Sequence, residues 1–241
     1  MEGLQTLIAK AESGDTIAQY NLGVEYAGKQ MFDKAVFWYK KAAEKGHAKA
    51  QNNLACCYGG GDGVEQDYKQ AAAWFQKAAE QGHAMAQANL GTYYLNGFGV
   101  EMDYEKAVFW YKQSAEQGYA RGECDLGYCY EMGYGVNKDY AQAVAWYTKS
   151  ANQGYARGQN NLAICYEQGR GVEQDYQEAI YWYRKSAEQG YASAMYHLGR
   201  CYENGYGMPR NQDKAVEWYK KAAWKGNAKA KEALTRLGVA F

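Results

Sequence analysis

The residues with the clearest chemical potential in this sequence are a few histidines and cysteines. His197 and Cys201 lie four residues apart, so both side chains would share one face of a helix. Such a pair could contribute to a zinc site, but a structural zinc ion takes about four ligands. Cys165 is the only obvious third ligand, and no nearby pair completes the set. We therefore predict no metal site and no cofactor.

The same residue types do not gather into a catalytic pattern. Two of the three histidines, His47 and His83, fall at a position that is tyrosine elsewhere in the chain. Acidic residues also recur at one position, as Glu131, Glu167 and Glu203. Catalysis needs a unique cluster of convergent groups, whereas a recurring position is typical of framework or surface. The sequence therefore predicts a protein that is not an enzyme.

A Gly-x-Gly sequence invites comparison with phosphate-binding loops. It recurs at 61–63, 97–99, 133–135, 169–171 and 205–207. A dinucleotide-binding loop needs a third glycine and a preceding strand, and this sequence has no strand pattern. We interpret these glycines as tight chain reversals between two helices. The Val or Met that follows would plug the end of the helix pair.

The elements that carry these residues repeat along the chain. A tryptophan recurs at intervals of 36 residues, as Trp38, Trp74, Trp110, Trp146, Trp182 and Trp218. A glycine recurs at the same interval, as Gly46, Gly82, Gly118, Gly154, Gly190 and Gly226. Only the first interval, from Gly14 to Gly46, is shorter, at 32. A fixed period of this size predicts a solenoid of stacked repeats.

Each repeat is predicted to form two helices, here called helix A and helix B. In the third repeat they span about 84–96 and 104–117, and Gly118 ends the second. Each helix B is expected to begin at an N-cap residue that accepts a backbone N–H: Asp67, Asp103, Asp139, Asp175 and Asn211. We expect the tryptophans to form a ladder that is buried or nearly so. One helix A position is expected to hold reduced, partly buried thiols, at Cys57, Cys129, Cys165 and Cys201.

The repeat pattern resembles the Sel-one-like repeat (SLR), a relative of the tetratricopeptide repeat. The residues that carry the resemblance are Ala86, Leu90, Gly91, Tyr94, Gly97, Gly99, Val100, Asp103, Ala107, Trp110, Tyr111, Lys112, Ala115 and Gly118. The resemblance covers about residues 15–241. It implies a right-handed superhelix of antiparallel helix pairs, with helix A on the concave side, and adaptor work in protein complexes. A cysteine-rich branch of the family joins its helices by disulfides, but the cysteines here fall at other positions, and the Ser-x-x-Lys pattern of penicillin-binding chemistry is absent.

These observations predict an all-α fold: a right-handed α/α superhelical solenoid of about six helix-turn-helix repeats with a capping helix at each end. We predict a single domain over residues 1–241. Its parts are an N-terminal capping helix at 1–14, repeats at 15–46, 47–82, 83–118, 119–154, 155–190 and 191–226, and a C-terminal capping helix at 227–241.

The composition limits the classes of partner that the protein is expected to bind. The 27 basic and 27 acidic residues balance, which gives no case for nucleic acid or an anionic membrane. Nothing approaches the roughly 20 consecutive apolar residues of a membrane span. The first residues lack a basic start followed by an apolar run, so no signal peptide is visible, although a trimmed chain is not excluded. We expect a cytoplasmic monomer that binds a protein or peptide.

The binding face is predicted from helical geometry. If the helix A leucine points inward, the residues one before, two before, five before and two after it point away. The row one before is polar: Asn21, Asn53, Asn89, Asp125, Asn161 and His197. An asparagine both donates and accepts hydrogen bonds, so this row could pair with a peptide backbone. The expected anchors are Arg121, Arg157 and Tyr128, and Arg200 lies in the row two after.

Three alternatives remain open at this point. The asparagines could instead bond to neighbouring repeats and stabilise the stack. The chain could be a carbohydrate- or cell-wall-binding module, because sugars stack on tyrosines such as Tyr20, Tyr128 and Tyr196. A hydrolase of the cysteine-rich SLR type is a third, weaker interpretation. The prediction we adopt is a non-enzymatic scaffold that binds its partner on the concave helix A face.

Overall fold

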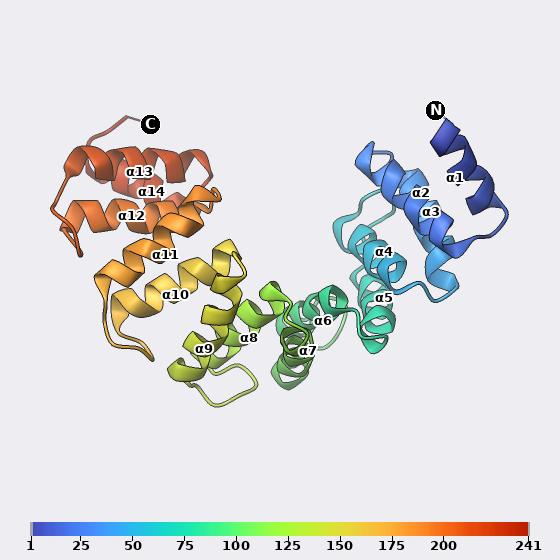
Figure 1. Cartoon of the computed structure of the whole chain (residues 1–241), viewed down its shortest axis with the longest axis horizontal. Helices are drawn as coiled ribbons and strands as arrows, with labels where there is room; N and C mark the ends of the chain where they lie inside the picture. The colour runs from blue at the N-terminus through green and yellow to red at the C-terminus, as the bar shows by residue number, and fades with distance from the viewer. Residues whose placement is uncertain (1, 241) are drawn as a thin grey trace. The chain divides into compact units, whose positions relative to one another are not determined.

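The computed structural model describes residues 2–240 of the chain, and within that range it is built from fourteen α-helices and no strands (Figure 1). The chain divides into two compact units, one up to Gly122 and one from Glu123. The first unit contains α1 (Glu2–Glu12), α2 (Thr16–Gly28), α3 (Phe32–Glu44), α4 (Ala48–Gly60), α5 (Tyr68–Glu80), α6 (Ala84–Asn96) and α7 (Tyr104–Glu116). The boundary falls inside α8 (Ala120–Met132). The second unit continues with α9 (Tyr140–Asn152), α10 (Ala156–Gln168), α11 (Tyr176–Glu188), α12 (Ala192–Asn204), α13 (Gln212–Trp224) and α14 (Ala228–Arg236).

Consecutive helices pack against each other within each unit. In the first unit α2 pairs with α3, α4 with α5 and α6 with α7, and α1 packs on α2 (Figure 1). In the second unit α10 pairs with α11 and α12 with α13, and α14 packs on α13. The all-α prediction, with helix pairs in tandem and an unpaired helix at each end, is confirmed. The prediction of one domain stays a prediction.

The helix starts are set by side chains that accept backbone N–H groups. The predicted caps of the helix B elements are confirmed: Asp67, Asp103, Asp139, Asp175 and Asn211. His47 and His83 cap α4 and α6 in the same way, because the Nδ1 of each ring accepts the backbone N–H three residues on at 3.2 Å. The framework role expected for these two histidines is therefore confirmed.

The buried aromatic ladder is not the predicted one. The six tryptophans are only half-buried, and a lysine amine covers several of the rings, as Lys77 does over Trp74 at 4.1 Å. The fully enclosed ring belongs to the next residue along each helix B: Tyr39, Phe75, Tyr111, Tyr147, Tyr183 and Tyr219. One residue turns a helix by about 100°. That step places the tyrosine against helix A and leaves the tryptophan partly buried on the core clusters. The tryptophans therefore line the core as predicted, but they are half-buried and not the most deeply buried rings.

Glycines allow the closest approaches in the core and in the loops. A Cβ on Gly91 of α6 would lie 2.7 Å from the ring of Tyr111, so only a glycine lets that ring lie against the helix. Gly97 ends α6 with a φ of +70°, and a Cβ on Gly99 would lie 2.2 Å from the backbone of Tyr68. Val100 packs against the core cluster that α5 and α6 share, and its predicted role as a plug for the end of the helix pair stays a prediction. The Gly-x-Gly sequence is therefore a structural turn pressed onto the preceding helix B.

The repeated cysteine position is more deeply buried than the partial burial predicted. Cys57, Cys129, Cys165 and Cys201 are all buried free thiols. Burial raises the pKa of Cys129 to about 12, so this thiol stays protonated at neutral pH. Cys56 is exposed. Across residues 2–240, no three His, Cys, Asp or Glu side chains gather as a metal site would require, and no helix has the length and apolar character to span a bilayer.

Candidate functional site

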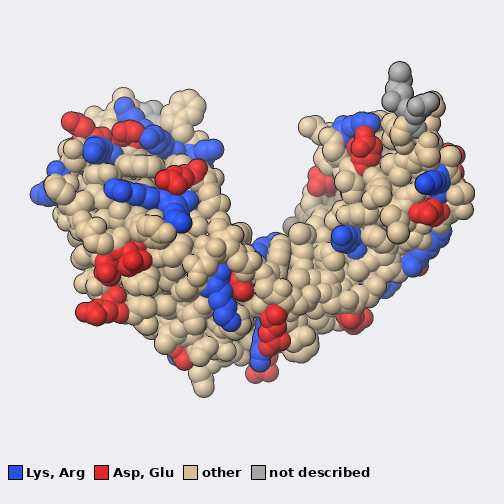
Figure 2. Space-filling view, in the orientation of Figure 1, with Lys and Arg blue, Asp and Glu red and all other residues tan. Residues whose placement is uncertain are grey.

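The candidate site is the surface formed by the first helix of each repeat, here called the helix-A face. It comprises the outward rows of α2, α4 and α6 in the first unit and of α8, α10 and α12 in the second. Figure 2 shows acidic and basic side chains interspersed over the visible surface of each unit. This mixture agrees with the zero net charge, so any preference for charge must arise locally.

The predicted asparagine row links one repeat to the next. Asn89 Nδ2 donates to Asn52 Oδ1 at 3.1 Å, and Arg121 Nη1 donates to Asn89 Oδ1 at 2.9 Å. Asn53 Oδ1 accepts from Asn52 Nδ2 at 3.2 Å. These bonds favour the alternative in which the row stabilises the stack. Partner binding by Asn53, Asn89 and Arg121 stays a prediction.

Asp125 does not lie on an open surface. It is only 7% exposed, and its carboxylate forms an ion pair with Arg157 of the following repeat. The expectation that Asp125 faces solvent is therefore wrong, because an arginine 32 residues away covers it. Arg157 Nε also donates to Cys124 Sγ at 3.3 Å, and Asn161 Nδ2 lies 3.8 Å from the same sulfur. Arg157 and Asn161 nevertheless remain half-buried rather than enclosed.

His197 and Arg200 belong to a polar cluster at the edge of the core. The His197 ring stacks on Tyr183 with 4.9 Å between centroids. Glu167 accepts from the Tyr183 hydroxyl at 2.5 Å and pairs with Arg200 at 3.3 Å. Burial, followed by the positive charges of Arg200 and Lys229, lowers the pKa of His197 to about 3. His197 is therefore a neutral structural residue near pH 7.

This burial predicts a pH dependence of stability. Folded His197 stays neutral, whereas the unfolded side chain takes up a proton near pH 6.5. The unfolded state thus binds more protons as the pH falls below 6.5, and stability should be lost at up to about 1.4 kcal/mol per pH unit. The control is His197→Asn, which restores the residue type of the same row. Urea unfolding between about pH 4 and 7 should give the variant a flatter slope, and equal slopes would contradict the assignment.

The second unit contains a hollow that we call the Tyr128 hollow. Its volume is about 330 Å³, and it is lined by Tyr128, Glu131, Arg157, Asn161, Ile164 and Tyr191. The structure thus brings together three of the predicted binding residues, Tyr128, Arg157 and Asn161. Tyr128 is 37% exposed at its surface.

Sequence reasoning missed Glu131 as a residue of the Tyr128 hollow. Glu131 accepts from the Tyr147 hydroxyl at 2.7 Å and pairs with Arg170 at 3.4 Å. The available signal was its position three residues after Tyr128, which places both on one side of α8. Its recurrence in later repeats indicates only a framework or surface position and hides this role.

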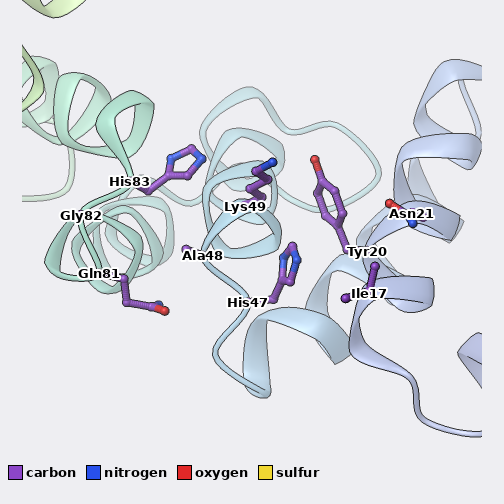
Figure 3. Close-up of a pocket in the computed structure, with 9 residues that line it drawn as sticks. All are labelled: Ile17, Tyr20, Asn21, His47, Ala48, Lys49, Gln81, Gly82 and His83. Atoms are coloured by element: carbon purple, nitrogen blue, oxygen red, sulfur yellow. The ribbon is translucent and has the colours of Figure 1, made fainter. Parts of the chain in front are cut away.

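The first unit contains a second hollow, here called the Lys49 hollow (Figure 3). Its volume is about 510 Å³, and it is lined by Ile17, Tyr20, Asn21, His47, Ala48, Lys49, Gln81, Gly82 and His83. The anchors predicted from the sequence are not among these residues. The sequence signal that could have indicated this hollow was the pair Ile17 and Lys49. Each lies five residues before the leucine of its helix A, so both belong to one outward row. His47 and His83 are framework residues, and both also line this hollow.

Comparison with known proteins identifies a repeat family that the chain matches along most of its length. The Sel1 repeat family model matches six times, at residues 16–47, 48–83, 84–119, 120–155, 156–191 and 192–227. The solved structure of a Sel1 repeat protein from Oxalobacter formigenes is 33% identical, with a TM-score of 0.82, and the match covers 92% of this chain and 97% of that one. No curated protein matches the chain.

A second solved structure is similar over almost the whole chain. It is a protective antigen present in uropathogenic Escherichia coli strains, and it displays an SLR fold. The two are 40% identical with a TM-score of 0.79, and the match covers 97% of this chain. The chain spans 52% of the length of that protein.

Proposed function

Because the chain belongs to the Sel1 repeat family, whose members are generally protein-interaction modules, we propose that it is a non-enzymatic scaffold that binds a partner protein through the Tyr128 hollow. The observation that supports this proposal is the hollow itself. An exposed tyrosine stands there beside a half-buried arginine, on the helix-A face. Tyrosine and arginine carry much of the binding energy in protein interfaces.

The lining of the Tyr128 hollow suits one apolar side chain of the partner. The rings of Tyr128 and Tyr191 and the side chain of Ile164 supply apolar surface, and Asn161 supplies an amide for backbone groups. Arg157 and Glu131 are held by their ion pairs with Asp125 and Arg170. Charges fixed in this way are pre-organised for recognition, which reduces the entropy lost on binding.

The remaining predicted residues form the surroundings of this proposed contact. Asn53, Asn89 and Arg121 lie on the helix-A face of the first unit, and Arg200 and His197 lie on that of the second. Their bonds within the stack make them secondary candidates. The carbohydrate alternative has less support, because Tyr20 is stacked on His47 and Tyr196 packs edge-on against His197, which leaves both half-buried.

We predict that Tyr128→Ala weakens partner binding by at least about tenfold, because truncation of a tyrosine that is an interface hot spot costs about 2 kcal/mol or more. The matched control is Tyr181→Ala, which removes a tyrosine that is 47% exposed on the helix B element α11. Partners are recovered by affinity purification and quantified by mass spectrometry for the wild type and both variants. Melting temperatures check that each variant is folded.

The outcome depends on which variant loses the partner. Loss with Tyr128→Ala and retention with Tyr181→Ala supports the proposal. Retention with Tyr128→Ala and loss with Tyr181→Ala would place binding on the helix B side and overturn it. A glycan array on the same proteins tests the carbohydrate alternative, which requires glycan binding that Tyr128→Ala abolishes.

A further inference from the structure

We propose that the Lys49 hollow binds a carboxylate group of a peptide partner. This hollow lies in the first unit, so the inference goes beyond the function proposed for the Tyr128 hollow and does not depend on it. It rests on the hydrogen-bond donors of the hollow, on the missing counter-charge of Lys49 and on the apolar walls.

The two histidines present donors because of their role as helix caps. Nδ1 of His47 accepts the backbone N–H of Ala50, and Nδ1 of His83 accepts that of Ala86, both at 3.2 Å. A neutral imidazole carries one proton, so an accepting Nδ1 places that proton on Nε2. Burial first, and the charge of Lys49 second, lower the pKa of both rings, which keeps them neutral near pH 7. Each ring therefore offers one Nε2–H donor.

Lys49 supplies a positive charge to the hollow. Within residues 2–240 it has no carboxylate partner, whereas Arg157, the residue at the equivalent position, pairs with Asp125. Lys49 occupies the row position of Arg157, whose partner in the preceding repeat is the carboxylate of Asp125. The residue equivalent to Asp125 is here Asn21, which carries no charge. Among the described residues, Lys49 forms no ion pair, and none of the residues lining the hollow is acidic. An external carboxylate would fill the role that Asp125 fills for Arg157.

The geometry allows these donors to act together. Lys49, His47 and His83 all line the same hollow, so one ligand group can approach all three. Figure 3 shows the side chains of Tyr20, His47 and Lys49 directed to the same side of the hollow. The Tyr20 ring stacks on His47 at 4.6 Å, and Ile17 is 65% exposed beside them. The site thus suits a carboxylate that is flanked by apolar side chains.

Three fluorescent peptides of one length test this proposal by anisotropy at low salt. The first has a Leu-Glu-Leu centre and blocked ends. The second has Leu-Gln-Leu in its place and is otherwise identical. The third keeps Leu-Gln-Leu and ends in a free carboxylate. We expect the first, the third or both to bind at least about tenfold more tightly than the second, a difference of about 1.4 kcal/mol. Comparing the affinities of the first and third peptides shows whether the hollow prefers a side-chain carboxylate or the carboxylate of a chain terminus.

Variants locate the binding without disturbing the fold. His47→Asn keeps a side-chain cap, as Asn227 does at the equivalent position of α14, but removes the Nε2–H donor. Asn21→Asp supplies an internal carboxylate to Lys49, in imitation of the Asp125–Arg157 pair. Lys49→Gln removes the charge. Each variant should weaken the preferred peptide about tenfold or more while the melting temperature stays within a few degrees. Tyr128→Ala should leave this binding unchanged.

Two results would overturn the inference. One is equal binding, or no binding, of the charged and uncharged peptides by the wild type. The other is a carboxylate preference that survives in folded Asn21→Asp and Lys49→Gln proteins, because the charge would then act elsewhere. Neither result bears on the Tyr128 hollow, whose test uses other variants.

Discussion

Tyr183→Ala is expected to lower the free energy of unfolding by about 3–5 kcal/mol, the usual cost of deleting a large buried ring. The Tyr183 side chain is 0% exposed, its ring stacks on His197, and its hydroxyl donates to Glu167. The alanine leaves a cavity and also leaves a buried carboxylate oxygen without its donor. Urea unfolding followed by circular dichroism measures the change.

Tyr181 provides the matched control on the same helix. Two residues before Tyr183, it is 47% exposed and packs edge-on against Trp182. Tyr181→Ala should cost no more than about 1 kcal/mol, because exposed substitutions seldom change stability further. Similar losses for the two variants would contradict the assignment of the buried ladder to the tyrosines.

Gly99→Ala is expected to destabilise the first unit by about 2–5 kcal/mol. The left-handed conformation of Gly99, with a φ of +66°, costs a non-glycine residue roughly 1–2 kcal/mol. The new Cβ would also lie 2.2 Å from the Tyr68 backbone, and relief of such overpacking costs about 1–3 kcal/mol more. The loop must therefore move away from α5.

Gly118→Ala separates the cost of the left-handed backbone conformation from the cost of the close contact with α5. Gly118 has a φ of +75°, but nothing lies within 4 Å of the position that a Cβ would take. Its substitution should cost only the conformational strain, roughly 1–2 kcal/mol. Thermal unfolding of both variants gives the difference that is due to close approach. A loss for Gly99→Ala no larger than that for Gly118→Ala would show that the loop is not pressed onto α5.

The features that depend on local sequence were predictable. The 36-residue period defined the helix pairs, and Asp103 and Gly118 marked the start and end of one helix B. A cap bonds to residues two or three positions away, so its partner is visible in the sequence. The recurrence of the cysteine position predicted a packing position with partial burial, and the structure buries it more deeply.

The features that depend on contacts between repeats were less accessible. Trp182 and Tyr183 are adjacent aromatic residues, and hydrophobicity alone does not show which of them meets the glycine or alanine of helix A. Asp125 looked exposed because its covering partner, Arg157, lies 32 residues further along the chain. The two hollows arise from the sizes of side chains on successive repeats, so a single helical projection does not reveal them.

The most direct test of the central claim, that the Tyr128 hollow contacts a partner protein, is site-specific photo-crosslinking. A benzophenone amino acid replaces Tyr128 in one protein and Tyr181 in another, so both probes start from tyrosines of similar exposure in the same unit. Irradiation in the presence of the recovered partner should give a covalent adduct from position 128 and none from position 181. An adduct from position 181 alone, with the partner still bound, would contradict the account.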